Sequence, residues 1–384
     1  MKIYVIAGEP SGDLLGSRFM RAMQKKHPEV VFVGVGGESM ENAGLNSLFD
    51  ISDLAVMGLA EVVPSIPKIL GLIKKTVADI EVQKPDVILT IDSWSFGARI
   101  QKIIRQKKLG IPQVHYVAPQ VWAWKKKRAK TMYKYIDLLL TLLPQEPKYF
   151  TPYHLKAECV GHPVIESQVV NGDAGAFRKK YHITENKTII SVLPGSRHNE
   201  VAALLPIFLE SARQLWERNP NLHFVIPTVK TVAERVKKMC LGLDLPLTLV
   251  EDEQGRYDAF KASSAAIAAS GTVALELAIA GVPHIVGYKV SPLTGWVAKK
   301  FLHIQFVNLS NIILGREIIP ELLQERCVAS NISLYIEGLL SHDDWYDKQI
   351  DGFKKVCTLL GQGEQTPSEK ACDVVCSLVE KWKK

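Results

Sequence analysis

The sequence predicts an α/β protein with two doubly wound, Rossmann-like domains that face a cleft. At 384 residues, the chain is too long for one ordinary hydrophobic core. Short, almost continuously apolar segments alternate with amphipathic helical patterns in both halves, which is typical of parallel sheets covered by helices on both faces. The strand pattern restarts after a polar stretch near the middle of the chain. Each half is therefore expected to form its own sheet.

The elements follow from the apolar patterns in chain order. In the first half, apolar runs predict strands at Lys2–Ala7, Val30–Val35, Val87–Ile91, Gln113–Val117 and Leu138–Leu142. Helical spacing predicts helices at Asp13–Lys26, Ile66–Gln83 and Phe96–Lys107. In the second half, strands are expected at Thr188–Leu193, Leu222–Pro227, Leu247–Val250, Ala265–Ala269 and His284–Gly287. Helices are expected there at Val201–Arg218, Val232–Leu241, Tyr257–Ala262 and Thr272–Ala280.

The break between the two domains is expected after Gly161-His162-Pro163, where a polar stretch follows. We therefore predict a first domain over residues 1–165 and a second over residues 166–342. Residues 343–384 read as a helical tail that packs on the first domain or on a partner subunit. Ligands of doubly wound sheets bind beyond the carboxyl ends of the strands, which predicts a site in the cleft.

Composition limits the class of protein and its compartment. Hydrophobic residues make up 47% of the chain and charged residues 23%, as in globular proteins, and the net charge of +7 favours acidic partners. The six cysteines form no CxxC pair, which favours free thiols in a reducing compartment. No secretory signal or stretch of ~20 apolar residues is visible. We expect a cytoplasmic protein, with attachment to a membrane surface left open.

The segment Ser270-Gly271-Thr272, which continues to Glu276, carries the most information about function. It follows an apolar strand and opens a predicted helix, which Ser270 or Thr272 can cap. The first-turn N–H groups and the positive end of the helix dipole suit a phosphate or diphosphate. Glu276 lies one turn later and can accept hydrogen bonds from two vicinal hydroxyls, as on a ribose. The alternative is an ordinary helix start with a solvated glutamate.

Other loops at strand ends carry polar residues. Gly8-Glu9-Pro10-Ser11-Gly12-Asp13 resembles a nucleotide-binding loop without the GxGxxG spacing, or it is a simple turn that Asp13 caps. Asp92 ends a predicted strand, where it suits a general base or a helix cap. Arg197, in Pro194-Gly195-Ser196-Arg197, offers a planar fork for phosphate oxygens. The histidines lack metal-ligand spacing, and neither a GxSxG elbow nor a Walker loop is present.

Two segments suggest contact with a membrane surface. Apolar residues recur at helical spacing beside lysines at Val62, Val63, Ile66, Ile69, Leu70 and Ile73. This pattern fits an interfacial helix, and a core-facing helix gives the same pattern. A second segment joins two tryptophans to a basic run, Lys125, Lys126, Lys127 and Arg128. It suits anionic headgroups, single-stranded nucleic acid or simple solvation.

Together these motifs resemble the lipid A disaccharide synthases, a family of bacterial GT-B glycosyltransferases. The matching pieces occur in family order at Ala7–Asp13, Ala55–Gly58, Lys84–Val87, His115–Trp124, Val160–Pro163, Leu193–Arg197, Ala269–Thr272 and Asn311 with Gly315–Glu317. The resemblance implies transfer from UDP-2,3-diacylglucosamine to 2,3-diacylglucosamine 1-phosphate (lipid X), with inversion and without a metal or other cofactor. The products would be a β-1′,6-linked disaccharide 1-phosphate and UDP.

The resemblance also implies roles for single residues. Ser270, Gly271, Thr272 and Arg197 would hold the diphosphate, Glu276 the ribose hydroxyls, and Asn311 would help to position the donor. Asp92 is the candidate base for the acceptor 6-hydroxyl, Glu9 is its rival, and Ser11 would contact the acceptor or the sugar. Relatives carry a second acid after Asp92, whereas Ser93-Trp94-Ser95 stands here, which puts the role of that acid in doubt.

Acylated substrates favour attachment to the inner face of the inner membrane, through an exposed Val62–Ile73 helix and the nearby basic run. The family resemblance further suggests a homodimer with exchanged C-terminal segments. One alternative is another GT-B-like enzyme that acts on UDP-GlcNAc, such as a 2-epimerase or a transferase for unacylated sugars. A basic protein that binds nucleic acid is disfavoured by the polar loops at the strand ends, so no nucleic acid partner is expected.

Overall fold

The chain folds into two α/β units, which we describe separately. The computed structural model describes all residues except 55–58, 122–125, 291–304 and 364. The first unit comprises Met1–Pro163 and Leu360–Lys384, and the second comprises Val164–Leu359. The chain thus leaves the first unit at the Gly161-His162-Pro163 segment and returns to it for its last residues.

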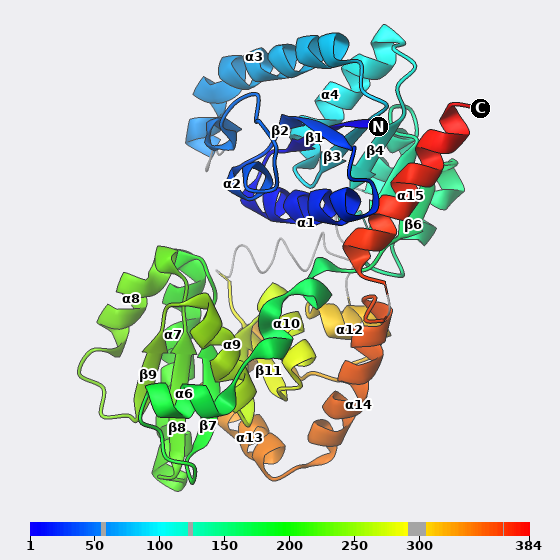
Figure 1. Ribbon diagram of the computed structural model, residues 1–384. Helices are drawn as coiled ribbons and strands as arrows, with labels where there is room; N and C mark the ends of the chain where they lie inside the picture. The colour runs from blue at the N-terminus through cyan, green and yellow to red at the C-terminus, as the bar shows by residue number, and fades with distance from the viewer. Residues whose placement is uncertain (55–58, 122–125, 291–304, 364) are drawn as a thin grey trace. The chain divides into compact units, whose positions relative to one another are not determined.

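A six-stranded parallel sheet forms the centre of the first unit, with strand order β2-β1-β3-β4-β5-β6. Its strands are β1 (Lys2–Ala7), β2 (Val31–Val35), β3 (Val87–Ile91), β4 (Gln113–Tyr116), β5 (Leu138–Thr141) and β6 (Lys156–Cys159). Its helices are α1 (Pro10–Lys26), α2 (Glu38–Glu41), α3 (Leu59–Gln83), α4 (Trp94–Lys107), α5 (Ala129–Met132) and α15 (Pro367–Trp382). Figure 1 shows α3 and α1 on opposite sides of this sheet.

Side-chain alternation along β1 explains this layering. Ile3 and Val5 point into one core with residues of α1 and α15, whereas Tyr4 and Ile6 point into another with residues of α3 and α4. Both faces of the strand are buried, so its sequence is continuously apolar.

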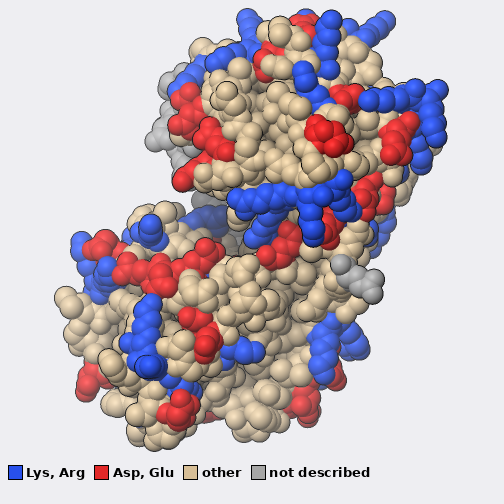
Figure 2. Space-filling view, in the orientation of Figure 1, with Lys and Arg blue, Asp and Glu red and all other residues tan. Residues whose placement is uncertain are grey.

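Figure 2 shows Lys and Arg side chains gathered along α1, the helix that carries Arg18, Arg21, Lys25 and Lys26.

The last two helices belong to different units, unlike the single tail expected from the sequence. Helix α14 (Asp344–Leu359) lies in the second unit, where Phe353 packs with buried residues of α10. Helix α15 packs on α1 in the first unit, where Cys372 and Val375 are fully buried. A capping box between Thr366 and Glu369 fixes where α15 begins.

A second six-stranded parallel sheet forms the other unit, with strand order β12-β11-β10-β7-β8-β9. Its strands are β7 (Thr188–Leu193), β8 (Leu222–Pro227), β9 (Leu247–Val250), β10 (Ala265–Ala269), β11 (His284–Tyr288) and β12 (Glu321–Leu323). The helices are α6 (Ala174–Lys180), α7 (His198–Arg218), α8 (Lys230–Cys240), α9 (Glu253–Ala262), α10 (Thr272–Ala280), α12 (Leu309–Leu314), α13 (Ala329–Leu340) and α14. Strands β10, β7 and β8 are neighbours, so the loops after them open at one edge.

The predicted fold class is confirmed, since each unit is a parallel sheet flanked by helices. The strands that sequence analysis missed are β6 and β12, which both lie at sheet edges. Strand β6 carries alternating charges in Lys156-Ala157-Glu158-Cys159, and β12 has only three residues. Neither offers the apolar run on which the other strands were recognised.

Candidate active site

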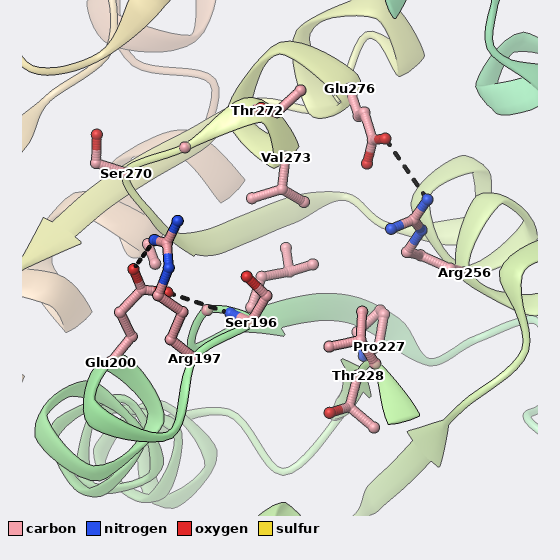
Figure 3. A pocket seen from close by; sticks show the side chains of 15 residues that line it. Ser196, Arg197, Glu200, Pro227, Thr228, Arg256, Ser270, Thr272, Val273 and Glu276 are labelled. Atoms are coloured by element: carbon pink, nitrogen blue, oxygen red, sulfur yellow. Dashed lines mark hydrogen bonds and ion pairs between the residues drawn. The ribbon is translucent and has the colours of Figure 1, made fainter. Parts of the chain in front are cut away.

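A pocket of about 300 Å³ opens in the second unit at the carboxyl ends of β7, β8 and β10. Figure 3 shows its lining, with Arg197 and Glu200 at one end and Arg256 and Glu276 at the other. Strands β10, β7 and β8 are consecutive in the sheet, which brings together loops that are far apart in sequence. This is where ligands of doubly wound sheets bind.

The N-terminus of α10 forms one wall of the pocket. Its N-cap is Gly271, whose backbone is extended at φ 171°, and no side chain caps the helix. The prediction that Ser270 or Thr272 caps α10 is therefore wrong. The Ser270 hydroxyl instead donates to the Val307 carbonyl oxygen at 3.0 Å, while Thr272 is exposed in the pocket. Helix α10 has nine residues, and because no side chain caps its start, the N–H groups of its first turn are available to an anion.

The loop between β7 and α7 brings Arg197 to the opposite end. Gly195 has φ +110°, and a Cβ there would lie 2.6 Å from Oε2 of Glu200, so only glycine allows this turn. Glu200 accepts hydrogen bonds from Nη1 of Arg197 at 2.6 Å and from the Ser196 N–H at 3.2 Å. The Arg197 side chain remains 79% exposed, which leaves its fork accessible to a ligand.

Glu276 lies one turn into α10 and faces Arg256 of α9. Its Oε1 is 3.5 Å from Nη2 of Arg256, and its side chain is only 14% exposed. Burial raises the pKa of Glu276, the Arg256 charge opposes this rise, and the Glu253 carboxylate adds to it. Glu276 is therefore a mostly buried carboxylate with a cationic partner, and not the solvated glutamate that sequence analysis left as the alternative.

Asn311 is placed differently from the predicted donor contact. Its side chain is fully buried, and its amide group donates to the Ile319 carbonyl oxygen at 2.8 Å and to Oε1 of Glu321 at 2.9 Å. Its Oδ1 accepts the N–H groups of Ile318 and Ile319 at 2.8 and 3.0 Å. Because both ends of the amide are occupied, Asn311 braces the loop before β12 and does not line the pocket.

Three polar residues of the pocket escaped sequence analysis, namely Glu200, Thr228 and Arg256. Glu200 lies three residues after Arg197 in the first turn of α7, a spacing that signals the pair. Arg256 reaches Glu276 from a different helix, so no local pattern could reveal that contact.

The predicted acid–base residues gather in the first unit at the end of β3. Oδ2 of Asp92 accepts a hydrogen bond from the Ser11 hydroxyl at 2.6 Å. A Cβ at Gly12 would lie 2.9 Å from the Ile91 carbonyl oxygen and 3.3 Å from Cβ of Asp92, so glycine lets α1 approach this strand end. Asp92 itself has a positive φ of 53°, a sparsely populated conformation for a residue with a side chain.

Glu9 lies next to this pair at the N-cap of α1 and makes no side-chain cap bond. Burial and the charge of Asp92 raise the pKa of Glu9, while a hydrogen bond with Ser93 opposes the rise. Asp13 has a structural role instead, since its buried carboxylate accepts the N–H groups of Gly37, Ser39 and Met40 at 2.7–3.1 Å. It therefore caps the start of α2 rather than its own helix.

Trp94, in the segment that departs from the family pattern, packs into the first unit. Its ring lies 4.8 Å from that of His115 and 6.0 Å from that of Tyr135, measured between centroids. His115 is fully buried, and its Nδ1 pairs with the Thr90 hydroxyl at 2.7 Å. Desolvation lowers the pKa of His115 to about 3, so the ring stays neutral.

The segments predicted to touch a membrane are described only in part. On α3, Ile66 and Leu70 are exposed, Ile69 packs against the core, and Ile73 is 2% exposed. Lys127 is exposed and Arg128 is half-buried. The side chains of Val62, Val63, Lys125 and Lys126 lie outside the described residues. The expected apolar face thus holds for Ile66 and Leu70, whereas Ile73 belongs to the core.

The described residues contain neither a membrane-spanning helix nor a cluster of metal ligands. No helix in that part of the chain is long and apolar enough to span a bilayer. Among the same residues, no three or more His, Cys, Asp or Glu side chains are grouped to hold a metal.

Solved structures share this architecture. The chain resembles the glycotransferase of kitacinnamycin with a TM-score of 0.66 and 14% identity, over 98% of both chains. It resembles UDP-GlcNAc 2-epimerase from Neisseria meningitidis, solved with UDP-GlcNAc, with a TM-score of 0.64 and 14% identity, over 99% of this chain and 100% of the other. At such identities the likeness concerns the fold alone. The two parallel sheets thus define a protein of the GT-B class.

Sequence comparison identifies the family within that class. The family described as lipid-A-disaccharide synthetase matches residues 3–375. A lipid-A-disaccharide synthase from Paramagnetospirillum magneticum is 46% identical over 100% of this chain and 99% of its own length. One from Rhodospirillum centenum is 42% identical over 99% of this chain and 95% of its own. The chain therefore belongs to the lipid-A-disaccharide synthase family of glycosyltransferases, which confirms the resemblance found in the sequence.

Proposed function

We propose that this enzyme transfers a diacylglucosamine unit from UDP-2,3-diacylglucosamine to the 6-hydroxyl of 2,3-diacylglucosamine 1-phosphate. The observation that carries the proposal is the pocket of the second unit. It combines an uncapped helix start, an accessible guanidinium at Arg197 and a sequestered carboxylate at Glu276. Diphosphate and ribose hydroxyls are the chemical groups of a nucleoside diphosphate sugar that these features suit. Membership of the family supports the choice of acylated substrates.

In the proposed reaction, the acceptor oxygen attacks the anomeric carbon of the donor sugar. The bond from that carbon to the diphosphate breaks, and UDP leaves with the electron pair. The N–H groups at the start of α10 and the Arg197 guanidinium stabilise the negative charge that develops on the diphosphate. The acceptor 6-hydroxyl gives its proton to Asp92, whose Oδ2 is held by the Ser11 hydroxyl at 2.6 Å.

Arg197 is assigned to the diphosphate because its guanidinium remains accessible, and Glu276 to the ribose because it lies one turn further along α10. The Ser270 hydroxyl donates to the Val307 carbonyl oxygen, so Ser270 would contribute through its backbone. Gly271 leaves open space, since among the described residues, apart from its chain neighbours and the backbone of its own helix, no atom lies within 4 Å of the Cβ position there. Glu9 remains the rival base, and burial together with the Asp92 charge raises its pKa, the direction that makes a carboxylate a stronger base.

Attachment to the membrane surface would bring the enzyme to its acylated substrates. The exposed side chains of Ile66 and Leu70, 44% and 47% accessible, support this proposal, because they lie beside the exposed Lys68. Apolar residues with basic neighbours are typical of interfacial helices.

The direct test is to incubate the purified enzyme with UDP-2,3-diacylglucosamine and lipid X and to analyse the products by mass spectrometry. The proposal predicts a disaccharide 1-phosphate and one UDP for each disaccharide formed, with EDTA present or absent. A parallel incubation with UDP-GlcNAc tests the 2-epimerase alternative. Epimerisation of UDP-GlcNAc without any disaccharide product would contradict the proposal.

A further inference from the structure

Arg256 connects two helices at the inner end of the nucleotide pocket. It lies in the first turn of α9, which the Asp252 carboxylate caps by accepting the Gly255 N–H at 2.6 Å. From there Arg256 lines the pocket and reaches across to Glu276 of α10, with 3.5 Å between Nη2 and Oε1. Figure 3 shows the two side chains pointing toward each other. The contact therefore depends on two helices that follow different strands.

The guanidinium of Arg256 is held from its own helix as well. Its Nη2 donates to the Tyr257 hydroxyl at 3.1 Å and lies 3.6 Å from Oε1 of Glu253. The Tyr257 hydroxyl in turn donates to Glu253 at 2.7 Å, and the guanidinium carbon is 5.0 Å from the Tyr257 ring centroid. A side chain fixed by several contacts loses little further entropy when it pairs with Glu276.

The Arg256 guanidinium favours the charged form of Glu276. Burial penalises its carboxylate and raises its pKa, and the Glu253 charge acts in the same direction. Arg256 is the cation that opposes both effects. Helix α10 carries no other charged side chain, and the Arg197–Glu200 pair lies at the other end of the pocket.

We propose that Arg256 is a positioning residue for nucleotide recognition, which holds Glu276 ionised and aimed so that its carboxylate accepts both hydroxyls of the ribose. This inference rests on the proposed role of Glu276. The ligand is the cis-diol of a nucleoside diphosphate, and Arg256 acts on it through Glu276. A carboxylate accepts from both hydroxyls, whereas a protonated carboxyl must use one oxygen as a donor and recognises the diol less well.

The inference makes nucleotide affinity depend on pH in a defined direction. With Arg256 present, we expect Glu276 to stay ionised between pH 8 and pH 6, so that UDP affinity changes little over this range. Without Arg256, desolvation and Glu253 act unopposed, so the pKa of Glu276 rises further. A larger fraction of Glu276 is then protonated as the pH falls, and UDP binding weakens toward pH 6.

The experiment is calorimetric titration of the full-length enzyme with UDP at pH 6 and pH 8, for wild type, Arg256→Gln, Arg256→Lys, Glu276→Gln and the double variant Arg256→Gln/Glu276→Gln. We expect Arg256→Gln to weaken binding by about tenfold at pH 6 and clearly less at pH 8, the scale of one lost charge-assisted contact. Arg256→Lys should restore the flat pH dependence because it retains the charge. In the Glu276→Gln background, Arg256→Gln should have little further effect.

Several outcomes would overturn the inference. Equal losses from Arg256→Gln with and without the Glu276 carboxylate would mean that Arg256 contacts the nucleotide itself. Unchanged affinity in Arg256→Gln would mean that Glu276 needs no partner. Glu253→Gln gives an independent test in a folded background, because it removes the charge that opposes ionisation. It should tighten UDP binding at pH 6 more than at pH 8, and a weakening there would contradict the inference.

A second ligand separates this inference from the proposed function. If 2′-deoxy-UDP binds wild type as tightly as UDP does, the ribose role of Glu276 fails, and the inference fails with it. If UDP binds more tightly than 2′-deoxy-UDP while Arg256→Gln has no effect at either pH, the ribose role stands and only the inference about Arg256 fails.

Discussion

Glu200 holds Arg197 through a hydrogen bond of 2.6 Å between Oε1 and Nη1. The same carboxylate accepts the Ser196 N–H at 3.2 Å. The donors that a diphosphate would use at this end of the pocket are thus shared with an acidic side chain that the protein supplies. A diphosphate must therefore share these donors with the Glu200 carboxylate or displace it from them. Because both groups are negatively charged, they repel each other when they meet at the same donors.

The first prediction concerns this competition. Glu200→Gln replaces the carboxylate with a neutral amide of similar shape, so UDP should bind about two- to fivefold more tightly, the scale of an ion pair worth up to ~1 kcal/mol whose arginine is exposed. Calorimetric titration measures the change. Arg213→Gln, at another exposed pair with Glu210, is the matched control and should leave affinity unchanged. Weaker binding by Glu200→Gln would show that Glu200 mainly positions Arg197.

The second prediction concerns the base. Asp92→Asn should lower turnover by ~10²-fold or more, the scale of general acid–base catalysis, with UDP affinity nearly unchanged. The pH–rate profile decides between Asp92 and Glu9, since activity falls as the pH drops through the pKa of the base. An acid limb that survives in Asp92→Asn and disappears in Glu9→Gln would assign the role to Glu9, whose pKa is raised.

The third prediction concerns helix α3. The double variant Ile66→Ser/Leu70→Ser replaces two exposed side chains, so it should reduce co-sedimentation with anionic vesicles without changing the melting temperature. Ile73→Ser is the matched control, because Ile73 is 2% exposed and its loss should destabilise the first unit by about 2–5 kcal/mol. Full retention on vesicles by the double variant would contradict the proposed surface.

The fourth prediction concerns acid stability. Burial lowers the pKa of His115 to about 3 and the pKa values of His162 and His284 to about 4. These rings are neutral in the folded state and take up protons in the unfolded state below their ordinary value of 6.5. Stability is therefore complete above that value and is lost as the pH falls, by on the order of 2 kcal/mol per ring at pH 5.

Urea denaturation between pH 7 and pH 5 measures this loss. His284→Asn should reduce the slope of unfolding free energy against pH in the second unit by the contribution of one ring. An unchanged slope would show that His284 is also protected from protonation in the unfolded chain.

Strands buried on both faces were predictable from the sequence, and edge strands were not. The bounds of β3 and β10 match the prediction because every residue in each is buried. Helix α9 begins four residues before the predicted Tyr257, since its first turn is polar and only its cap, Asp252, marks the start. Short apolar runs therefore locate the buried strands. The polar first turn of a helix is located only by its capping residue.

The site was predictable where loops at the ends of neighbouring strands carry the chemistry. Arg197, Thr272 and Glu276 line one pocket, as their positions at neighbouring strand ends suggested. Asn311 was predicted to help position the donor, and its buried amide braces a loop in the structure; an amide that braces a loop and one that binds a ligand look alike in sequence. Arg256 was missed because its partner Glu276 is on another helix, and only the packing of α9 against α10 brings them together.

The most direct test of the central claim is a crystal structure of the enzyme with UDP, grown in EDTA. We expect the diphosphate to lie against the start of α10 beside Thr272 and Arg197, with the ribose hydroxyls on Glu276. UDP bound away from this pocket, or a diphosphate that binds only when a divalent ion is supplied, would contradict it.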